Sequence, residues 1–177
     1  MIEVRAHILD IPTTQKKLEG IGATFDSDYA FKDVIFIPKK DRYNLDDDFL
    51  RMRIYTKNNW FVKNVVVARK QTQFTKSSKT NIVSLKKEFE TPEEAFDFIK
   101  KQFSLEFTYG FEFEREGWQY NFKDCRVFIE DIKGYGPSVE VEGESEQEIK
   151  SLLNQIKATE VMRSSVPEIM RKILNKI

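Results

Sequence analysis

The sequence predicts an α+β fold in which about eight antiparallel strands close into a barrel around a charged tunnel, with helices packed outside. Short segments in which charged and apolar residues alternate recur along the whole chain. Brief turns separate most of these segments, which favours antiparallel pairing. Few segments have the apolar spacing of a helix. The 177 residues contain no visible repeat or linker, so we expect a single domain over residues 1–177.

Glycine, proline and clusters of polar residues divide the chain into these elements. Asn58 and Asn59 indicate a hairpin, Gly117 indicates a break between two strands, and segment 71–80 is typical of a polar loop. Strands are expected over 1–8, 25–38, 49–55, 60–70, 82–90, 105–115, 118–122, 126–132 and 138–141. Helices are expected from residue 11 to the glycines at 20 and 22, after the helix start at 91–94, and over 145–157 and 166–177.

The amino-acid composition argues against several classes of function and of metal site. The 29 basic and 29 acidic residues balance, which argues against a general nucleic-acid binder. Cys125 is the only cysteine, so no disulfide can form within the chain and a cytoplasmic location is expected. No segment has the apolar length of a membrane span, so no membrane association is expected. A zinc site is not expected because His7 is the only histidine, so a bound metal would need carboxylates, which favours Mg²⁺ or Mn²⁺.

Charged residues share one face of several predicted strands, because the side chains of a strand alternate between its two faces. One interpretation is that these faces are solvated and the apolar faces form the core. The other is that the apolar face packs against helices and the charged face lines a tunnel. Pattern alone leaves both open. The charged sets are Glu3 with Arg5, Arg51 with Arg53, Lys86 with Glu88 and Glu90, and Glu140 with Glu142.

A tunnel that carries both signs of charge suits a triphosphate bound with a divalent cation. Arginine grips phosphate oxygens with two parallel hydrogen bonds, and lysine supplies a point charge. Carboxylates fit beside phosphates only when a cation lies between them, and Mg²⁺ favours that arrangement. His7 would face the same tunnel, either as a structural side chain or as a base, and the pattern leaves this choice open.

The order of the motifs resembles the CYTH family, the triphosphate tunnel metalloenzymes, over nearly the whole chain. The group within the family that the sequence resembles most is that of class IV adenylate cyclases. The matching segments are Glu3-Val4-Arg5 for Glu-x-Lys, Asp33-Val34-Ile35-Phe36 for Asp-x-Tyr-Phe, Leu50-Arg51-Met52-Arg53 for Leu-Arg-Ile-Arg, Ser78-Lys79 for Ser-Lys, Lys86-Lys87-Glu88-Phe89-Glu90 for Arg-x-Glu-x-Glu, Ile129–Gly136 for Leu-Asp-x-Val-x-Gly-Leu-Gly, and Val139-Glu140-Val141-Glu142 for Val-Glu-Ile-Glu.

The resemblance implies a role for each matching residue. The catalytic residues would be Arg5 and Lys70. The phosphate ligands would be Arg5, Arg51, Arg53, Lys70, Lys86 and Arg115, with Lys79 as a further candidate. The metal ligands would be Glu3, Glu130, Glu140 and Glu142, with Glu88 as a further candidate. Two positions depart from the family pattern, since Met1 replaces an acid and Phe113 replaces a lysine.

The resemblance implies that the chain converts ATP to cyclic AMP and pyrophosphate with Mg²⁺ or Mn²⁺. In that reaction the ribose 3′-hydroxyl attacks the α-phosphate. Two alternatives stay open: an inorganic or thiamine triphosphatase, in which water attacks the terminal phosphate, and a triphosphate-binding module without turnover, which the departures at Met1 and Phe113 would explain. The resemblance also suggests a homodimer.

Overall fold

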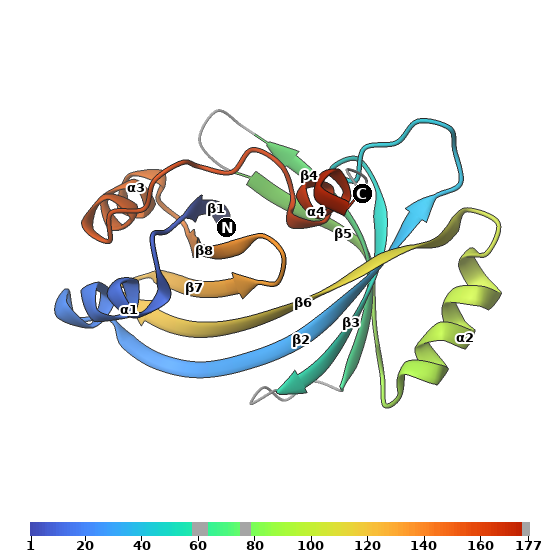
Figure 1. Ribbon diagram of the computed structural model, residues 1–177, viewed down its shortest axis with the longest axis horizontal. Coiled ribbons are helices and arrows are strands. Elements are labelled where there is room, and N and C mark those ends of the chain that lie inside the picture. The colour runs from blue at the N-terminus through green and yellow to red at the C-terminus, as the bar shows by residue number, and fades with distance from the viewer. Residues whose placement is uncertain (58–63, 75–78, 175–177) are drawn as a thin grey trace. The chain divides into compact units, whose positions relative to one another are not determined.

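The computed structural model describes residues 1–57, 64–74 and 79–174, and within them the chain forms eight strands and four helices (Figure 1). The predicted α+β class and the eight antiparallel strands are confirmed, whereas the closure of the sheet into a barrel stays a prediction. The elements are β1 (Ile2–His7), α1 (Ile11–Gly20), β2 (Thr24–Pro38), β3 (Phe49–Lys57), β4 (Val65–Phe74), β5 (Lys79–Phe89), α2 (Pro92–Phe103), β6 (Phe107–Phe122), β7 (Cys125–Ile132), β8 (Gly136–Gly143), α3 (Glu146–Gln155) and α4 (Val166–Leu174).

The described residues gather into two compact units, each treated separately below. No linker separates the units in the chain, because strands β2, β5 and β6 contribute residues to both. The first unit comprises Met1–Tyr29, Phe74–Thr80 and Arg115–Arg163, and the second comprises Ala30–Gln73, Asn81–Glu114 and Ser164–Ile177.

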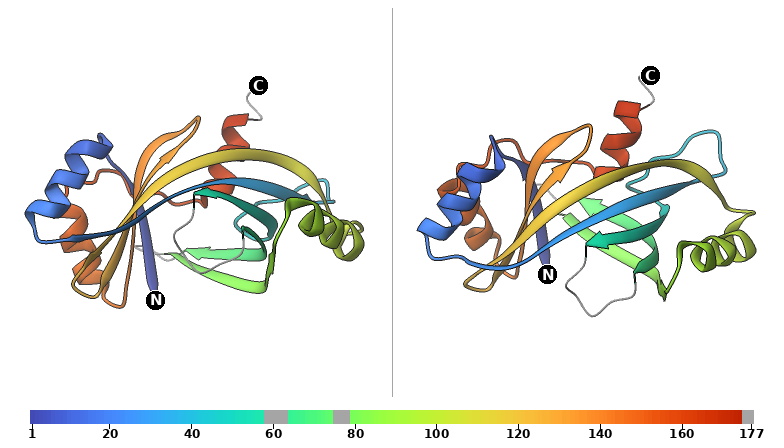
Figure 2. Two further views of the ribbon diagram at one scale, coloured as in Figure 1. Left: turned by 90° about the horizontal axis from the view of Figure 1, so that it is seen from below. Right: turned by 60° about the horizontal axis from the view of Figure 1, so that its bottom comes forward.

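In the first unit, strands follow the hydrogen-bonded order β6-β7-β8-β1, and β5 pairs with β1 at Lys79 and Glu3. Helices α1 and α3 lie next to each other beside the β7–β8 hairpin (Figure 2). The apolar side chains of the strands and helices form one buried core, which includes Val4, Val139, Val141, Leu18 and Ile149. The apolar face of β1 and β8 therefore packs against helices, as the tunnel interpretation requires.

The second unit has the order β5-β4-β3-β2-β6 and a core of its own. Ala95 and Ile99 of α2 pack against a cluster that includes Val34 and Met52. The predicted helix start is confirmed, because the side chain of Thr91 accepts a hydrogen bond from the amide of Glu94 and the Glu94 carboxylate accepts one from the amide of Thr91. This reciprocal cap satisfies amides that a helix leaves unpaired at its N-terminus.

Two of the predicted boundaries are wrong. β4 continues to Phe74 and β5 begins at Lys79, so most of the predicted loop over 71–80 is strand, and its residues 75–78 lie outside the described part of the chain. β6 runs without a break through Gly117, which the sequence suggested as a turn. The predicted hairpin at Asn58 and Asn59 also lies outside the described residues. None of the described helices is long and apolar enough to cross a lipid bilayer.

Gly117 serves a different purpose from the one its sequence context suggested. A Cβ atom at this position would overlap the ring of Tyr29, which lies against the strand there. A glycine inside a strand often marks such a close approach by another group. Gly117 therefore makes room for a side chain and does not end the strand.

Candidate functional site

The charged face of the first unit is built by the pairing of β1 with β8. Glu3 lies opposite Glu142, and Arg5 lies opposite Glu140. The alternate residues Val4 and Ala6 face the apolar core, so the charged residues of β1 project from the other face. This alternation explains why the sequence could identify the charged face.

Three carboxylates on this face come together. Glu3, Glu140 and Glu142 each offer a carboxylate oxygen, and the three oxygens lie within 4.8 Å of one another. Like charges directly opposite each other on neighbouring strands destabilise a sheet. Arg126 on β7 offsets part of this charge through an ion pair of 2.6 Å with Glu142. Carboxylate oxygens are the ligand type that hard divalent cations prefer.

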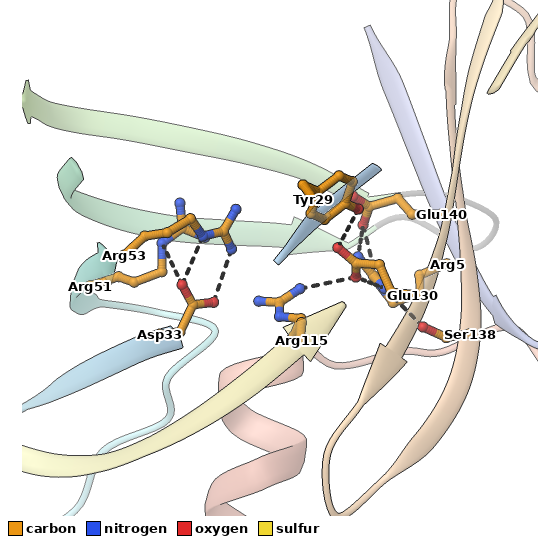
Figure 3. Close-up of polar contacts among 9 residues, drawn as sticks. All are labelled: Arg5, Tyr29, Asp33, Arg51, Arg53, Arg115, Glu130, Ser138 and Glu140. Carbon is orange, nitrogen blue, oxygen red and sulfur yellow. Dashed lines mark hydrogen bonds and ion pairs between the residues drawn. The ribbon is translucent and has the colours of Figure 1, made fainter. Parts of the chain in front are cut away.

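Glu130 on β7 occupies the centre of a separate buried cluster (Figure 3). Its Oε2 atom accepts hydrogen bonds from Arg5 Nη1 at 2.6 Å and from Arg115 Nη1 at 3.1 Å. Its Oε1 atom accepts a hydrogen bond of 2.8 Å from the hydroxyl of Tyr29. All four side chains are buried. Both Glu130 oxygens are therefore engaged by protein groups, although the resemblance had suggested a metal ligand here.

Arg5 joins this cluster to the group of three carboxylates. Besides Glu130, its guanidinium donates to Ser138 Oγ at 2.9 Å and to Glu140 Oε2 at 3.2 Å. Burial acts to lower the pKa of Arg5, but the neighbouring carboxylates Glu130 and Glu140 outweigh it and raise the pKa. Arg5 therefore stays charged and holds both carboxylates in place, and the roles in catalysis and phosphate binding that the resemblance implies for it stay predictions.

Tyr29 acts as a hydrogen-bond donor within this cluster. Burial and the negative charge of Glu130 raise the pKa of Tyr29 well above its ordinary value, whereas Arg5 and Arg115 lower it by less. The phenol therefore stays protonated and donates a hydrogen bond to Glu130. The space for its ring comes from Gly117, which lies opposite Glu130 in the register of β6 and β7.

The second unit contains a separate cluster around Asp33 of β2 (Figure 3). The Asp33 carboxylate is fully buried and accepts two parallel hydrogen bonds from Arg53, of 2.8 and 2.9 Å. Arg51 Nε lies 3.8 Å from Asp33 Oδ1. The Arg53 guanidinium also lies over the ring of Phe31, 3.6 Å from its centroid. Arg51 and Arg53 alternate on one face of β3, as the sequence predicts, and Asp33 orients Arg53 through its two hydrogen bonds.

Most of the other predicted ligands lie on strands β4 and β5 of the second unit. Lys70 is half-buried on β4, Lys86 is exposed on β5, and Glu88 is half-buried. Lys79 is placed by its backbone pairing with Glu3 in the first unit, and Ser78 lies outside the described residues. The roles of these residues in binding stay predictions.

Met1 and Phe113, the two residues that depart from the family pattern, each contact a defined neighbour in the structure. The sulfur of Met1 lies 3.4 Å from Nη2 of Arg126, which also pairs with Glu142. Phe113 is buried and stacks on Phe111 with a centroid distance of 6.2 Å. Each substitution therefore places an apolar or weakly polar group where the family has a charged one.

Sequence reasoning missed Tyr29 and Ser138 as members of the site. Ser138 alternates with Glu140 on β8, so the rule that identified Glu140 could have identified it too. Tyr29 carried no such signal, because its contact with Glu130 joins residues 101 positions apart in the sequence.

Comparisons with known proteins agree with this architecture. The model of the CYTH domain matches residues 1–172. A search of curated proteins found no match. Among solved structures, the PH1819 protein from Pyrococcus horikoshii OT3 is similar, with a TM-score of 0.80, 18% identity, and 99% of each chain covered.

Two further structures carry functional names. HpAC1 from Hippeastrum, a candidate adenylyl cyclase with a dominant triphosphatase activity, has a TM-score of 0.71 and 13% identity, with 97% of this chain and 95% of that chain covered. A candidate adenylate cyclase from Vibrio parahaemolyticus has a TM-score of 0.65 and 9% identity, with 95% of each chain covered. At these identities the structures show a shared fold. The match of the domain model over nearly the whole length shows that this chain belongs to the CYTH family.

Proposed function

We propose that this protein is an enzyme that acts on a triphosphate with the help of Mg²⁺ or Mn²⁺. The observation that carries the proposal is the group of Glu3, Glu140 and Glu142, whose oxygens lie within 4.8 Å of one another. Arg5 and Arg126 offset part of the repulsion among these carboxylates, and a bound divalent cation would offset more of it. Membership of the CYTH family supports a triphosphate as the substrate.

The side chains around this group fit a hard divalent cation. All three members are carboxylates, the ligand type that Mg²⁺ and Mn²⁺ prefer. Each of the three residues is half-buried, so water and phosphate oxygens could complete the coordination. When bound there, the cation would neutralise the carboxylates and the charge of the phosphates.

The protein's own residues would hold the substrate and orient it. Arg5 fixes Glu140 through two nitrogens, so this carboxylate is positioned before any ligand arrives. Arg115 reaches Glu130 with one nitrogen of a planar guanidinium, a group suited to bidentate phosphate contacts. Arg51, Arg53, Lys70 and Lys86 are further proposed phosphate ligands.

Two reactions fit this site. The resemblance to class IV cyclases favours conversion of ATP to cyclic AMP and pyrophosphate, with the ribose 3′-hydroxyl as the nucleophile. The triphosphatase activity in the printed description of HpAC1, which shares the fold, favours hydrolysis by water as the second candidate. Both reactions need an aligned nucleophile and stabilisation of the phosphate charge.

One assay tests the proposal. The purified protein is incubated with ATP, tripolyphosphate or thiamine triphosphate, together with Mg²⁺ or Mn²⁺, and the products are separated. Cyclic AMP with pyrophosphate identifies the cyclase, and orthophosphate identifies the hydrolase. Tight binding without turnover would show a binding module and contradict the enzyme proposal.

A pair of variants links the activity to the carboxylates. Glu3→Gln removes one of the three proposed ligands and should weaken Mn²⁺-dependent activity and the thermal stabilisation by Mn²⁺. Glu144→Gln is the control, because this nearby carboxylate is 81% exposed and lies outside the group of three. Equal Mn²⁺ responses in the two variants would contradict the metal site.

A further inference from the structure

The only histidine of the chain forms a specific contact with a tyrosine at the end of the charged face. The hydroxyl of Tyr135 lies 2.7 Å from Nε2 of His7, and the two rings have a centroid distance of 5.2 Å. Tyr135 belongs to the turn between β7 and β8, where Gly134 and Gly136 have φ angles of 87° and 111°. These left-handed conformations suit glycine and hold Tyr135 in a tight turn.

The backbone of His7 is fixed on both sides. Its amide donates to the carbonyl of Glu160 at 3.0 Å, and its carbonyl accepts from the amide of Thr159 at 2.9 Å. On its other edge it is the register partner of Ser138. Two neighbouring segments therefore position the backbone of the last residue of β1, and Tyr135 contacts its ring.

His7 lies on the same face of β1 as Glu3 and Arg5, because these residues alternate with the core residues Val4 and Ala6. The face thus presents a proposed metal ligand, then a guanidinium, then an imidazole in succession along one strand. Among the residues that the structure describes, only Nε2 of the two ring nitrogens makes a hydrogen bond. His7 is half-buried.

The groups around the pair favour a neutral tyrosine. Burial raises the pKa of Tyr135, the negative charge of Glu160 raises it further, and Arg5 lowers it by less. The phenol therefore keeps its proton at neutral pH, and its oxygen can accept a hydrogen bond from Nε2–H of His7. In the tautomer in which Nε2–H donates to this oxygen, Nδ1 is the basic nitrogen, and this tautomer is part of the proposal below.

We propose that His7 is a catalytic residue of the triphosphate reaction: its Nδ1 atom accepts the proton of the attacking hydroxyl group, and Tyr135 positions the imidazole. This inference rests on the proposed function of the charged face. Imidazole changes its protonation state near neutral pH, which suits a general base, and a base oriented by a third group is the arrangement that such catalysis requires.

The step balances in protons and electron pairs. The oxygen of the attacking hydroxyl forms a bond to phosphorus as its proton passes to Nδ1, which gives an imidazolium. The bond from phosphorus to the bridging oxygen breaks, and the phosphate leaving group takes the electron pair. The imidazolium then returns its proton to the leaving group or to water. Throughout, Nε2–H donates to the oxygen of Tyr135.

The single histidine allows a direct test that does not depend on turnover. In ¹⁵N-labelled full-length protein, the two imidazole nitrogens give one pair of resonances, since no other histidine is present. We expect the Nε2–H tautomer near neutral pH and a shift of the Nδ1 resonance when tripolyphosphate and Mg²⁺ are added. The Nδ1–H tautomer with no response to bound tripolyphosphate would overturn the proposal.

Variants separate the chemical role from a structural one. His7→Gln keeps an amide group able to reach Tyr135 but has no basic nitrogen, so kcat should fall by about 10²–10⁴-fold with little change in tripolyphosphate binding. Tyr135→Phe should lower kcat by about 10-fold and shift the pH profile, because the imidazole loses its orienting partner. Tyr109→Phe is the matched control, as this tyrosine is 52% exposed on β6.

Two further readouts decide between the outcomes. The acidic limb of the wild-type pH profile of kcat should be absent in His7→Gln. Added imidazole should restore turnover to His7→Ala. Wild-type kcat and pH profile in His7→Gln would overturn the inference while leaving the proposed function intact, whereas loss of all triphosphate binding by the wild type would overturn the proposed function itself.

Discussion

Gly117 and Tyr29 fit against each other because Gly117 has no side chain. A Cβ atom at position 117 would overlap Cζ, Cε2 and Oη of the buried tyrosine ring. The hydroxyl of this ring donates to Glu130, which in turn binds Arg5. Gly117 has no polar side chain, but the space that it leaves lets Tyr29 reach Glu130 in the candidate site.

Gly117→Ala should destabilise the protein by about 1–3 kcal/mol, because the ring of Tyr29 must move within a packed interior. Denaturant unfolding measures this difference. Gly20→Ala is the control, since nothing lies within 4 Å of the Cβ that it would add. A stability of Gly117→Ala equal to that of Gly20→Ala would show that Tyr29 moves aside freely.

Glu130→Gln should be more harmful than its small change in shape suggests. The substitution removes the negative charge between the buried guanidiniums of Arg5 and Arg115. Loss of one partner of a buried ion pair costs about 3–5 kcal/mol. Urea unfolding of Glu130→Gln and of Glu116→Gln, an exposed position on β6, tests this expectation. Comparable unfolding midpoints for the two variants would contradict it.

Arg53→Ala should combine a loss of stability with any loss of phosphate affinity. The carboxylate of Asp33 is fully buried, and the substitution removes its bidentate partner, at a cost of about 3 kcal/mol. The double variant Asp33→Ala with Arg53→Ala should recover part of this loss, because it leaves no uncompensated carboxylate. Thermal unfolding of Asp33→Ala, Arg53→Ala and the double variant gives the coupling free energy between the two residues. Additive losses would mean that the two residues are energetically independent.

Glu168 of α4 should stabilise the protein at neutral pH and lose this stabilising effect in acid. Burial acts to raise the pKa of Glu168, but hydrogen bonds from Arg171 and from the amide of Leu45 outweigh it and lower the pKa. A carboxylate with a lowered pKa in the folded state stabilises the fold above its unfolded pKa, and this contribution is lost as the pH falls below about 4.5.

The measurement compares unfolding free energies from pH 6 down to pH 3. Glu168→Gln should be less stable than the wild type at pH 6, and the difference should shrink at lower pH. Asp41→Asn, at an exposed position in the loop before β3, should keep the wild-type slope. A constant difference between Glu168→Gln and the wild type across this range would contradict the linkage.

The sequence identified the face of the site better than its internal contacts. Alternation along β1 and β8 is local, so Glu3, Arg5, Glu140 and Glu142 were assigned to one face correctly. The contact between Arg5 and Glu140 joins residues 135 positions apart, and its existence depends on strand register, which local alternation does not encode. Gly117 was misread for the same reason, because the ring that fills its space comes from another strand.

The two separate apolar cores have a consequence for how the chain opens. Backbone amides exchange with solvent through local unfolding, and each cooperative unit sets its own exchange rate. One core packs around α1 and α3, and the other packs around α2. Strands β2 and β6 enter both units, with the boundaries at residues 29 and 114. The rate of deuterium uptake along β2 and along β6 should therefore change at these residues. The two parts of each strand would then report the separate opening free energies of the two units.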